Sequence, residues 1–221
     1  MEKIIGLLDK YYMVYLQGLW GTLWISAVTV LCSTLLGLLI AALRMSRSKL
    51  LNSFAGAYIE VLRGTPILLQ LYFFWIGLPK LLPFELSDTM CIVVALVINA
   101  SAYISEIIRA GINAVDKGQW EAARSVGLSE VHMMTHVIMP QAVKNILPAI
   151  ANEFVVIIKE SAITYTIGVQ DIMSAVQQVK GATFVIIEPL LVATAIYFCL
   201  CFPTSKVIAY FERRMSRGDK R

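Results

Sequence analysis

The sequence predicts an all-α integral membrane protein with about five transmembrane helices. Of the 221 residues, 58% are hydrophobic and only 15% are charged, whereas soluble domains average about 25% charged residues. The uncharged residues gather in long runs, and a helix needs about 20 of them to cross a bilayer. The basic residues gather in short clusters beside these runs. Alternation of this kind is typical of a helical membrane protein.

Five apolar runs are long enough to be transmembrane spans. They lie at about residues 16–43, 54–78, 88–108, 147–168 and 189–210. Between the third and fourth lies the longest polar segment, residues 109–144, which is too long for a tight turn and is therefore expected to be functional. Residues 1–16 are expected to form an amphipathic helix on the outer surface.

The basic clusters predict the orientation. Arg44, Arg47 and Lys49 follow the first span, and a second cluster ends the chain (Arg213, Arg214, Arg217, Lys220 and Arg221). Because basic residues favour the cytoplasmic side, we expect an N-out/C-in topology with residues 109–144 inside. The clusters lack interleaved aromatic residues, so nucleic-acid binding is not expected.

The polar segment contains its own helical pattern. Ala122 and Ala123 are strong helix formers, and Gly127 suits the left-handed position that closes a helix. Pro140 is expected to mark a further break. A rigid helix on the cytoplasmic face offers a surface that another protein can bind.

This segment resembles a known motif. Glu121, Ala122 and Ala123, then Gly127 and the apolar pair before Pro140, resemble the EAA loop of type I ATP-binding-cassette (ABC) importer permeases. The usual Ile and Leu of the loop are Val137 and Met139 here, and both remain apolar. EVLRGTPILLQ at 60–70 and AYISEIIRAGIN at 102–113 resemble the polar amino-acid subfamily, which covers histidine, glutamine, arginine, glutamate, cystine and opine importers. The resemblance covers roughly residues 15–215.

The resemblance implies one permease domain over residues 1–221, with residues 109–144 as the EAA loop. Glu121, Ala122, Ala123 and Gly127 would be contact and hinge positions for a separate ATPase. The implied partners are an ATPase dimer, an external amino-acid-binding protein and a second permease copy, identical or homologous, in a bacterial cytoplasmic membrane. ATP and Mg²⁺ would be bound by the ATPase, because this chain has no G-x-x-x-x-G-K-[ST] loop and is not expected to be an enzyme.

Several polar side chains fall inside the predicted spans, where ionisable groups cost about 2.5–3.5 kcal/mol. Asn99 and Glu106 share one face of the third span, and Glu153 and Glu160 share one face of the fourth. We predict that Asn99 and Glu153 contact the substrate, because a carboxylate suits an ammonium group. The alternative is that Glu153, Lys159 and Glu106 pair to hold the bundle together. Lys159 and Glu160 are also candidates for an outer gate.

Arg63 and Pro66 mark a special point in the second span. Pro66 weakens helical hydrogen bonding, so this point is either a pivot for transport or a packed kink with Arg63 reaching the inner interface. No metal site is predicted, because His132 and His136 have no third ligand beyond Glu130. The four cysteines read as small apolar residues.

Two other classes compete with an ABC permease. A secondary transporter or channel leaves the EAA-like segment without a purpose, and transport without an ATPase would favour it. A membrane enzyme would need a catalytic cluster, and the sequence offers none. The particular amino acid, and the choice between homodimer and heterodimer, do not follow from the sequence.

Overall fold

The computed structural model describes residues 2–83 and 85–216, and every regular element in this part of the chain is a helix. In chain order the elements are α1 (Glu2–Arg44), α2 (Lys49–Gly64), α3 (Ile67–Leu81), α4 (Asp88–Asn113), α5 (Lys117–Ser125), α6 (Glu130–His132), the π-helix η1 (Met133–Ile138), α7 (Met139–Glu160), the 3₁₀-helix η2 (Ser161–Ile167), α8 (Ile172–Thr183) and α9 (Ile187–Ser216). The predicted all-α class is confirmed.

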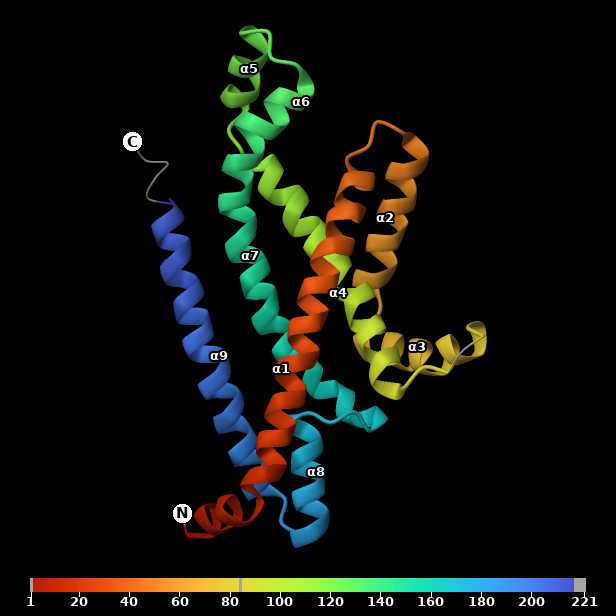
Figure 1. Cartoon of the computed structure of the whole chain (residues 1–221), viewed down its shortest axis with the longest axis vertical. Coiled ribbons are helices and arrows are strands. Elements are labelled where there is room, and N and C mark those ends of the chain that lie inside the picture. The colour runs from red at the N-terminus through yellow and green to blue at the C-terminus, as the bar shows by residue number, and fades with distance from the viewer. Residues whose placement is uncertain (1, 84, 217–221) are drawn as a thin grey trace.

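α1 joins the predicted surface helix at residues 1–16 and the predicted first span at residues 16–43. Its 43 residues correspond to about 64 Å at 1.5 Å per residue. No proline lies between the predicted surface helix and the first span, so the helix is continuous, although its first turns run crosswise to the rest (Figure 1). Leu7 and Tyr15 in this first part are buried against α8 and α9. It therefore packs on protein rather than lying alone on the outer surface.

The predicted second span is broken into α2 and α3, which meet at a bend of 109°. Pro66 has no backbone N–H, and Thr65 before it is extended at φ −119° and ψ 147°, as a following proline requires. The predicted special point at Pro66 is therefore a sharp corner within residues 54–78. Among the described residues, α1, α4 and α9 are long and apolar enough to cross a membrane, and the bent pair makes a fourth candidate. The count of five remains a prediction.

α4 lies between α1, α3 and α7 and continues past the predicted end of the third span to Asn113. α6, η1 and α7 follow one another directly, so the helix of the fourth span starts well before residue 147. The helix does not break at Pro140 as expected, because the π-helix η1 directly before it leads into α7. The Met139 N–H donates to the Met134 carbonyl, and this wider turn carries the helix into Pro140 without interruption.

Two apolar clusters stabilise the molecule, one at each of its ends. One joins α4, α5, η1 and α7 with Ala41 near the end of α1, and the other joins α8 and α9 with the first part of α1. α5 and α6 lie at one end and the N-terminus and α8 at the other (Figure 1). Arg47, in the turn after α1, pairs with Glu130 at the α5 end, as the predicted topology requires. The orientation in a membrane remains a prediction, and Arg217, Lys220 and Arg221 lie outside the described residues.

Candidate functional site

α5 is a short helix whose ends are set by local hydrogen bonds. The Asp116 carboxylate at its N-cap accepts from the Gly118 N–H at 2.7 Å. At the other end Gly127 has φ +78°, a conformation that glycine adopts without a steric penalty. The Leu128 N–H then donates to the Ala123 carbonyl at 3.1 Å. The expectation that Gly127 closes this helix is confirmed.

The two faces of α5 have different surroundings. Ala123 is only 4% exposed and packs in the cluster with α4 and η1, so it anchors the helix. Glu121 and Ala122 are exposed. Val126 and Val131 are 75% and 70% exposed, and the sequence pattern did not single them out. The exposed side of α5 and the turn after it therefore carry both polar and apolar side chains.

The segment after α5 is tied to the rest of the chain by charge. Arg47 donates to both oxygens of the Glu130 carboxylate, but both side chains are solvent-exposed, so the pair stabilises by about 1 kcal/mol at most. The rings of His132 and His136 stack at 5.4 Å. Within the part of the chain that the structure describes, no three His, Cys, Asp or Glu side chains gather as metal ligands do.

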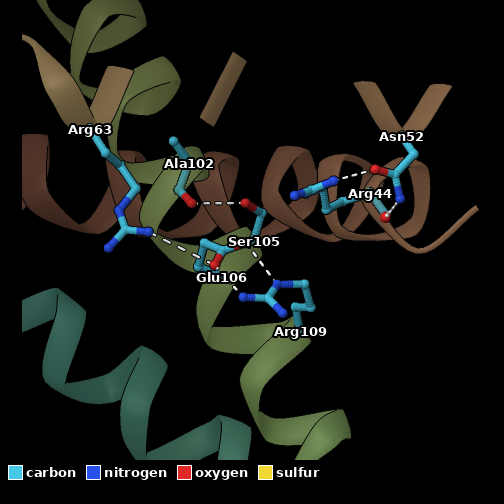
Figure 2. Close-up of polar contacts among 7 residues, drawn as sticks. All are labelled: Arg44, Asn52, Arg63, Ala102, Ser105, Glu106 and Arg109. Atoms are coloured by element: carbon cyan, nitrogen blue, oxygen red, sulfur yellow. Dashed lines mark hydrogen bonds and ion pairs between the residues drawn. The ribbon is translucent and has the colours of Figure 1, made fainter. Parts of the chain in front are cut away.

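Glu106 on α4 lies between two arginines (Figure 2). The Arg109 Nε and Nη2 atoms donate to its two carboxylate oxygens at 2.9 Å and 2.6 Å. Arg63 at the end of α2 approaches it at 3.8 Å and lies 5.3 Å from the ring centre of Tyr103. The alternative prediction, that Glu106 pairs with Glu153 and Lys159, is therefore wrong. Its carboxylate links α2 to α4.

Asn99, also on α4, is 4% exposed. Its side-chain amide donates to Gln70 Oε1 at 2.8 Å, and Gln70 is itself buried at the start of α3. Asn99 is therefore enclosed by protein in this conformation, and its contact with the substrate stays a prediction. Gln70 was missed by the sequence analysis, because its partner lies 29 residues away.

α7 carries the remaining predicted residues. Glu153 and Glu160 are half-buried, while Asn152 and Lys159 are exposed. Asn145, Asn152 and Lys159 recur every seven residues and therefore lie on one face. Among the described residues, the ion pairs do not include Glu153, Lys159 or Glu160. The predicted pairing of Glu153 with Lys159 is not formed here.

A polar cavity of ≈ 330 Å³ lies between α7 and α9. Side chains from both helices line it: Asn145, Pro148, Ala149, Asn152, Ser205, Ile208, Ala209 and Glu212. Polar groups in contact with hydrocarbon are costly, so this flank of the molecule faces water or another protein.

Long apolar helices, a polar flank and a short helix projecting from one end define a class of protein, a membrane-embedded transport component. The profile of the family described as "binding-protein-dependent transport system inner membrane component" matches residues 33–217. The chain belongs to this family.

Known relatives are similar to this chain over nearly its whole length. The arginine transport system permease protein ArtQ of Bacillus subtilis is 42% identical over 204 residues, covering 92% of this chain and 93% of that protein. The putative glutamine transport system permease protein GlnP of Rickettsia conorii is 36% identical, covering 97% and 98%. A chain in the crystal structure of an amino acid ABC transporter with histidines is 44% identical, with a TM-score of 0.90 over 94% of this chain and 96% of that one.

Family membership confirms the predicted class. The protein is an integral membrane permease subunit, a transport component and not a catalytic protein by itself. A permease of an ABC importer works with an ATPase and a substrate-binding protein. The two competing classes, a secondary transporter or channel and a membrane enzyme, are set aside.

Proposed function

We propose that this chain carries a polar amino acid across a bacterial cytoplasmic membrane as one half of a dimeric passage. The observation that carries the proposal is the polar face of α7. Asn152 and Lys159 are exposed in the single chain, in a helix otherwise rich in apolar residues, and such groups avoid lipid. A second permease copy, identical or homologous, enclosing this face would form a water-filled passage.

The proposed substrate contact is Glu153. Its carboxylate is half-buried beside the polar face and is free of ion pairs with described residues. Every amino acid has an ammonium group, and a relative named for arginine and a neighbour solved with histidines favour substrates with basic side chains. Lys159 and Glu160, at the end of α7, are proposed gate residues.

The proposed source of energy is hydrolysis of ATP. The ATPase dimer would bind the ATP together with Mg²⁺. Glu121 and Ala122 on the exposed side of α5, and the turn at Gly127, would contact the ATPase. Ala123 supports that surface from beneath. An external amino-acid-binding protein would deliver the substrate at the opposite end, near α8.

The test is uptake into proteoliposomes that contain this chain with its ATPase and binding protein. ATP is sealed on the ATPase side, and radiolabelled arginine, histidine, glutamine and leucine are offered outside. We expect ATP-dependent accumulation of arginine, histidine or glutamine and not of leucine. Accumulation of none of them by an assembled complex would refute the amino-acid assignment, and uptake without ATP would refute the coupling.

Glu153→Gln tests the substrate contact in the same vesicles. Loss of one charged hydrogen-bonding partner costs about 1.5–3 kcal/mol, or roughly 10- to 100-fold in KM. Glu60→Gln, on an exposed position of α2, is the matched control and should leave KM unchanged. A wild-type KM in Glu153→Gln would remove this residue from the site.

A further inference from the structure

The corner between α2 and α3 leaves backbone carbonyls without their usual donors. In a continuous helix the Leu62 carbonyl would accept from the N–H of residue 66, but that residue is proline and has none. The Val61 carbonyl accepts instead from the Thr65 hydroxyl at 2.8 Å. A buried carbonyl without a donor is costly, and most of all at membrane depth. The Leu62 carbonyl therefore needs a donor from elsewhere.

Gln70 supplies that donor. Its Nε2 atom lies 2.8 Å from the Leu62 carbonyl oxygen, 2.7 Å from Thr65 Oγ1 and 3.2 Å from the Thr65 carbonyl oxygen. The side chain is 7% exposed. One side-chain amide in the first turn of α3 thus satisfies the last turn of α2 across the bend.

Asn99 holds this amide in place from α4. Its Nδ2 atom donates to Gln70 Oε1 at 2.8 Å, which leaves Nε2 directed at the corner. Leu71, the next residue of α3, is fully buried and packs with Ile92 and Leu96 of α4. The corner is therefore attached to α4 by a buried polar contact and an apolar contact at the same place.

We propose that Gln70 is a positioning residue that replaces the missing donor of Pro66 and, through Asn99, makes the α2–α3 corner and α4 one rigid unit of the transport cycle. The corner does not flex as a free pivot. Its bend is set by a side chain whose orientation α4 controls. The part of this inference that concerns transport rests on the proposed function, while the geometric part does not.

The geometric test measures the bend itself. Spin labels are placed at the exposed positions Leu50 and Leu81 after the native cysteines are replaced, and labelled chain is diluted with unlabelled chain. Both helices exceed 20 Å at about 1.5 Å per residue, so relaxing the bend by ~20° lengthens the label separation by about 5 Å. We expect Gln70→Met to broaden and lengthen the distance distribution.

Leu69→Met, at an exposed position one residue away, is the matched control and should leave the distances unchanged. An unchanged distribution in Gln70→Met would overturn the proposal. If Gln70→Met does not fold, Gln70→Glu takes its place, because the carboxylate keeps the length and accepts from Asn99 but does not donate to Leu62.

A double-mutant cycle separates donor replacement from simple packing. Pro66→Ala returns a backbone N–H to the corner, so the fall in melting temperature caused by Gln70→Met should be at least halved in that background. Equal falls in both backgrounds would mean that Gln70 only packs, and would overturn the proposal.

Uptake provides the final readout. Gln70→Met should lower the maximal uptake rate at unchanged KM, in contrast to Glu153→Gln, because a positioning residue affects the conformational step. A raised KM at unchanged maximal rate would refute the inference about transport. If the distances lengthen but even the wild-type complex takes up no amino acid, the proposed function falls and the structural role of Gln70 stands.

Discussion

α4 and α9 are both long and apolar enough to cross a membrane, yet their surroundings are opposite. In the most apolar stretch of α4, 61% of the residues are buried inside the protein, against 11% in α9. α4 is covered by α1, α3 and α7, whereas α9 lies on the flank of the molecule (Figure 1). Apolar composition therefore identifies a membrane helix but does not say whether protein or lipid surrounds it.

Side-chain size and polar groups account for the difference. Ser101, Ala102 and Ser105 on α4 are completely buried, and small residues of this kind allow neighbouring helices to approach closely. α9 instead exposes large side chains such as the stacked pair Phe198 and Phe202. α4 is thus the scaffold on which the polar contacts are built, and α9 is a covering helix.

The largest effect is expected from filling the contact between α4 and α7. A Cβ atom at Gly111 would lie 2.4 Å from the Ile146 side chain, so Gly111→Leu should separate the helices and cost about 3 kcal/mol or more. We expect loss of a monodisperse peak in detergent size-exclusion chromatography. Gly77→Leu, where the neighbouring space is open, is the control, and normal behaviour of Gly111→Leu would contradict close packing around α4.

The next largest effect is expected at Gly127, which follows the end of α5. Gly127→Asp places a carboxylate on the proposed ATPase surface and should abolish ATP-driven uptake and weaken ATPase co-purification, while the chain still inserts. Gly127→Asn is the matched control, because asparagine has a similar size and tolerates the left-handed conformation. If both variants transport at the wild-type rate, α5 has no coupling role.

A smaller effect is expected at the link between α2 and α4. Glu106→Gln weakens the two-point contact with Arg109 and leaves Arg63 without its ion pair. We expect a loss of about 1–2 kcal/mol, or roughly 2–8 °C in melting temperature for a chain of this size. Glu130→Gln breaks a solvent-exposed pair with Arg47 and should lower the melting temperature by less than about 2 °C. Equal shifts would mean that depth in the bundle does not matter.

The smallest effect is expected on α9. Phe198→Ala, at a side chain 62% exposed, should change the free energy of unfolding by no more than about 0.5 kcal/mol. Leu96→Ala on α4, at a side chain 2% exposed, should cost about 2–5 kcal/mol. Thermal unfolding of the two variants measures the difference, and a similar loss for both would show that the face of α9 that carries Phe198 is packed against protein.

Features that depend on neighbouring residues could be predicted from the sequence. The long apolar helices follow from composition, the end of α5 follows from the freedom of Gly127, and the corner follows from the missing N–H of Pro66. The family motif was equally local, because its residues lie within one loop. In each case the backbone responds to side chains only a few positions away.

Tertiary structure decided what each polar side chain does. Ala123 is an anchor because η1 and α4 cover it, and Glu106 pairs with Arg63 because the corner brings α2 beside α4. Asn99 donates to Gln70, a partner 29 residues away in the sequence. Helical periodicity places a residue on a face, but the helix that covers that face is chosen by packing between segments far apart in the chain, and that choice is made only in the folded molecule.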